Sequence, residues 1–231
     1  MTHLTLFSTL AVRKALDDFV IDAFTQRTGT AITAVFDPTN ALLRRIETGE
    51  GFDVLIGVTS SFDKLGKAGV VDLFTRVAIA RTGIGLAVGP GAPLPRIDTA
   101  DALLESLLNA RSVAYSRTGA SGIYFAELLT RLGIAEEVNS RATILEKGFT
   151  AEALLDGRAD IAIQQLSELL FVPDARIAGP LPADVQHYTE FSAVVAARAS
   201  RSATALALRD FLAEPASRDA YRRARLEDAR G

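Results

Sequence analysis

The residues best suited to chemistry form a short polar turn in the middle of the chain. They are Ser116, Arg117, Thr118, Gly119, Ala120, Ser121 and Gly122. A buried-strand pattern at 112–116 precedes this turn, and a helical pattern at 123–132 follows it. The first N–H groups of a helix lack partners within the helix and carry the positive end of its dipole, so the turn is expected to bind an anion. The alternative is that Ser121 merely caps the helix.

More loops rich in hydroxyl groups follow predicted strands in the first 70 residues. They contain Ser8 and Thr9, then Thr39 and Asn40, and then residues 59–61. Hydroxyl and amide groups are donors that suit a small anion, whereas the alternative role of such residues is helix capping. We expect the first two of these loops to contribute ligand-binding residues.

Two arginines bear on the charge of the expected ligand. Arg117 lies in the central turn, and Arg81 lies in a long apolar run at 76–88. A guanidinium group binds a carboxylate through two parallel hydrogen bonds, whereas neutral donors alone can hold a tetrahedral oxyanion. An arginine directed at the ligand would therefore favour an organic acid. The alternative is that both are solvated surface charges.

The sequence offers acid and base groups for catalysis but no activated nucleophile. It has no cysteine and no Gly-x-Ser-x-Gly motif, and its two histidines lie far from the polar loops. Proton transfer next to a carboxylate needs only one base and one acid. The groups that could supply them are Tyr115, Tyr124, Glu146, Lys147 and Glu168. Spacing favours none of them over the others, and a structural or solvated role fits each.

Composition excludes several classes of protein. The chain has 231 residues, a net charge of −3 and 48% hydrophobic residues, which is ordinary for a globular protein and argues against nucleic-acid binding. No stretch approaches the roughly 20 apolar residues of a membrane span, so no membrane insertion is expected. Without cysteine, and with only two separated histidines, neither a metal site nor a cofactor is expected. Nothing in the sequence points to oligomers, and we expect a monomer.

Strand and helix patterns alternate along the chain, which is typical of parallel sheets covered on both faces. Two long apolar runs, at 76–88 and 187–197, interrupt the alternation, and we interpret them as strands that cross between domains. We therefore predict an α/β fold of two doubly wound lobes joined by two crossing strands. Lobe one comprises 1–80 and 190–231, and lobe two comprises 81–189. Because ligands of such sheets lie beyond the carboxyl ends of the strands, we expect a ligand cleft between lobes that close by a hinge.

The order of these motifs resembles the periplasmic-type solute-binding proteins of the molybdate-binding branch, across nearly the whole chain. The stretches that carry the resemblance are Phe7-Ser8-Thr9-Leu10, residues 36–49, Asp53-Val54-Leu55-Ile56 and Ala120-Ser121-Gly122-Ile123-Tyr124. The resemblance implies a type II periplasmic-binding-protein fold, whose lobes close on an oxyanion held by hydroxyl and backbone N–H groups. It also implies delivery of the ligand to the permease of an ABC transporter.

Several residues match positions that bind the ligand in that family. Ser8 corresponds to the serine of the first loop, and Thr39 falls where a second serine is usual. Ala120 and Ser121 match the site at a helix start, and Thr150 matches a backbone donor at another helix start. This chain departs from the family where a tyrosine usually follows the 161–163 strand. Gln164 and Gln165 stand there instead, and we expect one of them to face the ligand.

The predicted function is that of a solute-binding protein that closes on a small anion and serves ABC transport. The anion would be an oxyanion such as molybdate or tungstate, or an organic carboxylate. The alternative is a cytoplasmic isomerase of an unsaturated carboxylic acid, because one type of relative on this branch isomerises aconitate. The chain start lacks a signal-like run, so we expect a cytoplasmic protein, or a periplasmic one if an export signal was removed. A cytoplasmic ligand sensor is a third, weaker alternative.

Overall fold

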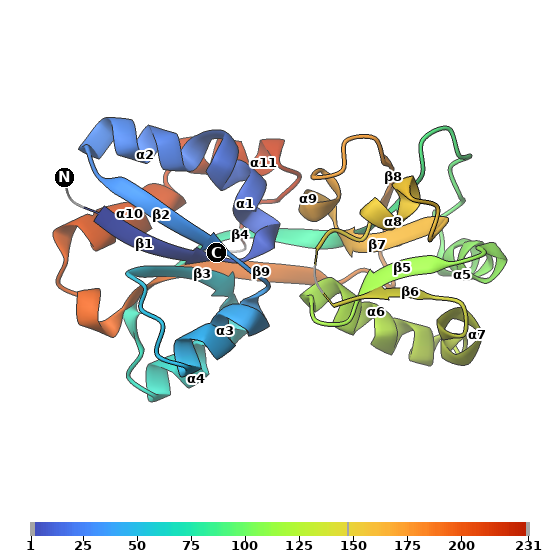
Figure 1. Cartoon of the computed structure of the whole chain (residues 1–231), viewed down its shortest axis with the longest axis horizontal. Coiled ribbons are helices and arrows are strands. Elements are labelled where there is room, and N and C mark those ends of the chain that lie inside the picture. Colours follow the sequence, from blue (N-terminus) through green and yellow to red (C-terminus); the bar gives the residue numbers. More distant parts are fainter. Residues whose placement is uncertain (1–2, 147, 230–231) are drawn as a thin grey trace. The chain divides into compact units, whose positions relative to one another are not determined.

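The computed structural model describes residues 3–146 and 148–229, and its contacts divide the chain into two compact units. Unit 1 contains the chain up to Arg81 and again from Glu190, and unit 2 contains Thr82–Thr189. The chain leaves unit 1 within β4 (Val71–Val88) and returns within β9 (Tyr188–Ala196), as Figure 1 shows. The predicted α/β fold with two crossing strands is confirmed.

The sheet of unit 1 has the strand order β2-β1-β3-β9-β4. β1 (His3–Ser8) pairs in parallel with β2 (Ala31–Phe36) and with β3 (Val54–Val58), whereas β9 is antiparallel to β3. In this register the last residues of β1 and β2 lie side by side, and Ser8 lies beside Ile56. The carboxyl ends of all three parallel strands therefore meet at one edge of the sheet.

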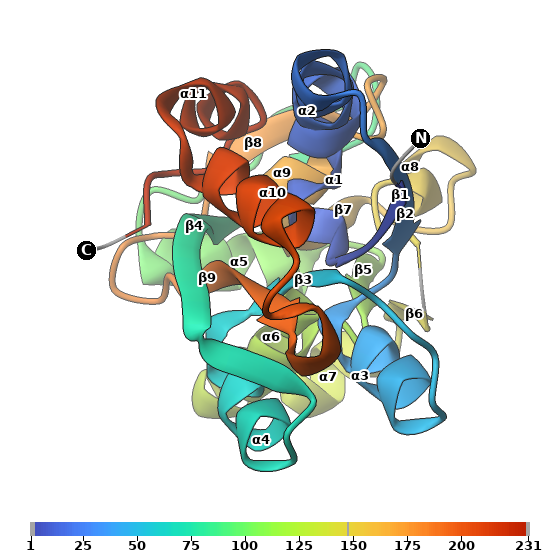
Figure 2. The same ribbon diagram turned by 90° about the vertical axis from the view of Figure 1, so that its left-hand side faces the viewer.

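Helices cover both faces of the unit 1 sheet. In Figures 1 and 2, α2 and α11 lie on one side of it and α3 and α4 on the other. The helical segments of unit 1 are η1 (Leu10–Val12), α1 (Arg13–Ala15), η2 (Leu16–Val20), α2 (Ile21–Thr28), α3 (Thr39–Glu47), η3 (Thr59–Ser61), α4 (Phe62–Lys67), η4 (Ala197–Ala199), α10 (Ala203–Ala213) and α11 (Pro215–Arg223). Their apolar faces bury an aromatic-rich core that includes Phe7, Phe24, Phe62, Phe191 and Tyr221.

The sheet of unit 2 has the order β4-β7-β5-β6, and β8 (Arg176–Pro180) also pairs with β4. β5 (Val113–Ser116) is parallel to β6 (Thr143–Leu145) and to β7 (Ile161–Gln165), whereas β4 is antiparallel to β7. The helices of unit 2 are α5 (Ala100–Asn109), α6 (Ala120–Arg131), α7 (Ala135–Asn139), α8 (Glu152–Leu155) and α9 (Leu166–Leu169). No helix in the described part of the chain is both long enough and apolar enough to span a bilayer.

The two faces of the unit 2 sheet carry separate apolar clusters. Ile161 and Ile163 of β7 pack in one cluster with Phe125 of α6, whereas Ala162 packs in the other with residues next to α8 and α9. Because side chains alternate along a strand, Gln165 belongs to the α6 face and Gln164 to the opposite face. This alternation decides what each of the two glutamines can contact.

Candidate functional site

The parallel strands of unit 2 end together and place three polar loops at one edge. Ser116 lies beside Leu145 of β6, and the register of β5 with β7 places Gln164 next to Ser116 on the other side. Residues 116–121, 146, 148–150 and 164–168 therefore share the edge where ligands bind in parallel α/β sheets. Most of the site residues that the sequence predicted for this unit lie in these loops: Ser116, Arg117, Ala120, Ser121, Thr150, Gln164 and Gln165.

The first of these loops exposes the N-terminus of α6 to this edge. Gly119, not Ser121, occupies the N-cap position, and it provides no side-chain cap. The Ser116 hydroxyl accepts hydrogen bonds from the N–H groups of Thr118 (3.3 Å) and Gly119 (3.1 Å), which fixes the turn. A Cβ atom at Gly122 would lie 1.8 Å from the carbonyl oxygen of Ser116, so only glycine lets α6 start this close to β5. The result is an anion-binding geometry with N–H groups left for a ligand.

Two polar residues on the α6 face bury most of their surface, and their side chains form no hydrogen bond within residues 3–146 and 148–229. Ser121 is 2% exposed and Gln165 is 3% exposed. Neither side chain has a polar atom among the fully buried, unpaired atoms of the described chain, so these groups reach solvent and can donate to a ligand at this edge. The alternative interpretation, in which Ser121 caps α6, does not agree with the structure.

Gln164 instead supports the neighbouring loop from the opposite face of the sheet. Its side-chain oxygen accepts hydrogen bonds from the N–H (2.8 Å) and hydroxyl (3.0 Å) of Thr150, and its amide nitrogen donates to the Gly148 carbonyl at 3.3 Å. Thr150 is fully buried, and its hydroxyl also bonds to the Ile163 carbonyl. The backbone donor predicted at Thr150 is thus already bonded within the protein.

Replacing each glutamine by leucine is expected to separate these two roles. Gln164→Leu leaves the buried Thr150 N–H without its acceptor, and we expect it to lower the free energy of unfolding by about 2 kcal/mol more than Gln165→Leu does. Gln165→Leu should weaken ligand binding instead. Urea unfolding and calorimetry on both variants check this, since the two side chains are equally buried. Equal stability losses would contradict the assignment.

Glu168 is an unusually buried carboxyl group at the same edge. It lies in the first turn of α9, three residues after Gln165, and is 9% exposed. Burial raises its pKa to about 7, although hydrogen bonds from the Gln164 side chain and the Gln165 N–H favour the ionised form. Sequence spacing did not distinguish this residue. The available signal was a glutamate at the third helical position, which is typical of a helix-capping box.

The other acid and base candidates are engaged elsewhere. The Tyr115 hydroxyl donates to Asn139 at 2.7 Å, and burial raises the pKa of this phenol. The Tyr124 hydroxyl donates to the Val185 carbonyl, and its ring stacks on His187. Glu146 is exposed, and Lys147 lies outside the described residues. Among the described candidates, Glu168 alone combines burial with a pKa raised toward neutrality.

The two predicted arginines both pair with carboxylates. Arg117 lies at the unit 2 edge, and its Nε atom is 3.0 Å from Glu146 in a pair exposed by more than half on both sides. Such a surface pair is weak, so Arg117 remains able to meet a ligand carboxylate. Arg81 belongs to unit 1, where two backbone hydrogen bonds and a side-chain contact of 2.6 Å join it to Glu227. Arg81 therefore holds the C-terminal segment against β4.

The corresponding edge of unit 1 is also rich in hydroxyl groups. Ser8 is fully buried and donates to the Thr9 carbonyl, while the Thr9 N–H bonds to Ile56. Thr39 begins α3, and its hydroxyl accepts the Val58 N–H at 3.3 Å. The structure thus brings Ser8, Thr9 and Thr39 to one edge.

Two further observations complete the unit 1 edge. The Thr59 hydroxyl bonds to the Ser192 hydroxyl at 2.8 Å. Ser192 lies on β9, far along the sequence, and the sequence patterns gave no reason to include it. Asn40 lies one residue inside α3 with an exposed side chain, so it does not occupy the cap position.

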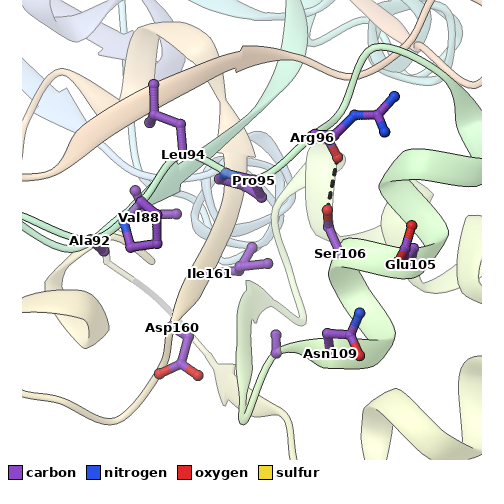
Figure 3. Close-up of a pocket in the computed structure, with 12 residues that line it drawn as sticks. Val88, Ala92, Leu94, Pro95, Arg96, Glu105, Ser106, Asn109, Asp160 and Ile161 are labelled. Atoms are coloured by element: carbon purple, nitrogen blue, oxygen red, sulfur yellow. Dashed lines mark hydrogen bonds between the residues drawn. The ribbon is translucent and has the colours of Figure 1, made fainter.

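A pocket of about 570 Å³ lies at the opposite edge of the unit 2 sheet (Figure 3). It is lined by Val88 and Ile161 at the strand ends and by Leu94, Asn109 and Asp160 around them. Arg111 already pairs with Asp160 at 2.9 Å. The pocket contains none of the predicted site residues and lies at the amino ends of β5 and β7, so we do not assign the ligand to it.

Comparison with known proteins identifies the relatives of this chain. The sequence pattern of the bacterial extracellular solute-binding proteins matches residues 4–224. This chain belongs to that family. A protein from a Pseudomonas species named aconitate isomerase is 32% identical over 219 residues, covering 92% of this chain and 83% of that protein. A small-ligand-binding role therefore follows from the family.

Solved structures of solute-binding proteins have the same fold. The periplasmic molybdate-binding protein of Azotobacter vinelandii matches with a TM-score of 0.81 and 18% identity, over 98% of this chain and 100% of that one. The sulfate-binding protein SubI of Mycobacterium tuberculosis matches with a TM-score of 0.79 and 16% identity, over 99% and 88% of the two chains. The periplasmic-binding-protein fold predicted from the sequence is confirmed.

Proposed function

We propose that this solute-binding protein is an isomerase that moves the double bond of a small unsaturated polycarboxylate such as aconitate. The observation that carries the proposal is the 32% identity to an aconitate isomerase across 92% of the chain. The transport role predicted first from the sequence has no comparable support from a relative of this similarity. The alternative predicted from the sequence thus becomes the preferred function.

The unit 2 edge supports this proposal chemically. Polycarboxylates need several donors, and the N-terminus of α6, the Ser121 hydroxyl and the Gln165 amide provide them without a metal ion. Arg117 adds a positive charge at the same edge. Ser8, Thr9 and Thr39 are proposed as further donors to the same class of ligand.

The reaction needs no second reactant. A base removes a proton from the methylene carbon next to one carboxylate, and the C–H electron pair forms a new double bond to the central carbon. The former double bond opens, and its outer carbon receives a proton to become the new methylene group. Moving the double bond in this way converts the trans isomer of aconitate into the cis isomer, with no change in atoms or oxidation state.

Incubation of the protein with trans-aconitate tests the proposal directly. Proton NMR is expected to show conversion toward a mixture with cis-aconitate, and in D₂O the methylene position should gain deuterium. Heat-inactivated protein is the control for spontaneous conversion. Tight binding of trans-aconitate with neither conversion nor deuterium uptake would contradict an isomerase and would leave a non-catalytic binding protein.

Binding of an oxyanion is the second candidate, and the similarity to the molybdate-binding and sulfate-binding structures favours it. Neutral hydroxyl and N–H donors, as at both strand edges, suit such ligands. If this candidate is right, calorimetry detects molybdate, tungstate or sulfate but not aconitate. A permease of an ABC transporter would then be the expected partner.

A further inference from the structure

A buried carboxyl group without a cationic partner lies at the ligand-binding edge of unit 2. Within residues 3–146 and 148–229, Glu168 forms no salt bridge, although it is only 9% exposed. Buried carboxylates are normally paired with a positive charge, because an unpaired charge is costly in a low-dielectric interior. An exception at a ligand-binding edge is a common feature of catalytic acids and bases.

The surroundings of Glu168 hold its carboxyl group in place. The Gln164 side chain and the Gln165 N–H both donate to it. The Gln164 oxygen is in turn fixed by two hydrogen bonds from Thr150. A chain of contacts thus connects Glu168 through β7 to the 148–150 loop. The hydroxyl of Ser167, the residue before Glu168, is buried and has no hydrogen-bond partner in the described part of the chain. A hydrogen-bonding group next to the carboxyl group is therefore left available.

We propose that Glu168 takes up and returns the proton during isomerisation and that Gln164 is its positioning residue. This inference rests on the proposed function. The Glu168 carboxylate accepts the proton from the substrate methylene carbon and becomes a carboxylic acid. The released electron pair shifts the double bond, and the acid then gives its proton to the carbon at the other end of the three-carbon unit. Glu168 ends in its starting state, so the cycle balances.

The protonation chemistry of Glu168 agrees with both halves of this cycle. Burial raises its pKa to about 7, so near neutral pH both the basic and the acidic form are populated. The groups that bond to it, the Gln164 side-chain amide and the Gln165 backbone N–H, are both neutral donors. The N-terminus of α6 lies at the same edge and can hold a substrate carboxylate while the charge moves.

A purely structural role for Glu168 predicts different results. Its bond to the Gln165 N–H is that of a capping box, in which glutamine serves as well as glutamate. Glu168→Gln therefore keeps the cap and removes only the ability to exchange a proton. Glu168→Asp keeps the acid but moves it by one methylene group. Glu105→Gln, on the exposed side of α5, is the matched control.

The experiment compares wild type, Glu168→Gln, Glu168→Asp and Glu105→Gln with trans-aconitate. We expect Glu168→Gln to lower kcat about 100- to 10,000-fold while the Kd for trans-aconitate changes less than about threefold. Deuterium uptake into the methylene position should fall in parallel. Glu168→Asp should retain part of kcat with its pH inflection shifted, and Glu105→Gln should behave as wild type.

Each other outcome is also decisive. A wild-type protein that neither isomerises nor exchanges deuterium refutes the proposed function itself, before any variant is made. Conversion by Glu168→Gln at a rate near wild type refutes only the role of Glu168.

If Glu168→Gln fails to fold, Glu168→Asp decides. A proton-transferring carboxyl group moved by one methylene group lowers kcat and shifts the inflection of kcat, whereas a purely structural residue leaves both as in wild type. For Gln164→Leu, a positioning role predicts an inflection at higher pH, since a donor to the carboxylate is lost.

Discussion

Gly122→Ala is expected to lower the free energy of unfolding by about 3 kcal/mol or more, the largest effect of a single methyl group in unit 2. The added Cβ would lie 1.8 Å from the Ser116 carbonyl oxygen and 2.7 Å from the carbonyl carbon, so the backbone must move. The first turn of α6 would then separate from β5, and its N–H groups would no longer lie at the strand edge. Urea unfolding measures the first effect, and calorimetry with trans-aconitate measures the second.

Gly119→Ala is the matched control in the same turn. Its backbone has a φ of −76°, and the added Cβ would be 3.4 Å or more from its nearest neighbours in the Ser116 side chain. We expect a loss below about 1 kcal/mol, from the weaker capping tendency of alanine alone. Similar losses in the two variants would show that the close approach of α6 to β5 does not carry the stability of this turn.

The second large expected effect is a pH-dependent stability difference between wild type and Glu168→Gln. The folded pKa of Glu168, about 7, lies above its ordinary value of 4.5, so the folded state binds this proton more tightly than the unfolded state. The contribution of Glu168 to the free energy of unfolding is therefore fully present below about pH 4 and is lost as the pH rises toward 7. Between pH 4 and pH 8 the variant should gain about 3 kcal/mol relative to wild type, because glutamine does not ionise.

Urea unfolding at several pH values, without ligand, measures this difference. Both proteins contain all other titratable groups, so the contributions of those groups cancel in the difference between the two free energies of unfolding. Glu105→Gln removes an exposed carboxyl group and keeps Glu168, so this variant should not show the trend. A constant difference between wild type and Glu168→Gln across this range would contradict the burial of an unpaired carboxyl group.

Local patterns were sufficient to predict the architecture. Alternating strands and helices indicated parallel sheets, and the two long apolar runs corresponded to β4 and β9, the strands that cross between the units. Because parallel strands end at a common edge, loops that follow such strands also lie together. That rule predicted ligand-binding residues in the loops that follow the strands, among them Ser8 and Thr39, but it did not distinguish Gln164 from Gln165.

Other features depend on contacts between distant residues, which no local pattern contains. Arg81 pairs with Glu227, a residue 146 positions away, and only the return of the C-terminal segment to β4 creates this contact. The burial of Glu168 depends on how α9 packs, and its sequence resembles that of an ordinary helix start. The two adjacent glutamines could be told apart only once the faces of β7 were known.

The insertion of β9 next to β3 also bears on how the polypeptide assembles as it leaves the ribosome. All residues of unit 2 precede Glu190, whereas the sheet of unit 1 lacks the strand beside β3 until β9 has been translated. Unit 2 can thus form its own core first, while β3 of unit 1 still lacks its partner strand and exposes unpaired backbone groups. Nascent unit 1 is consequently the portion that most needs protection from aggregation during synthesis.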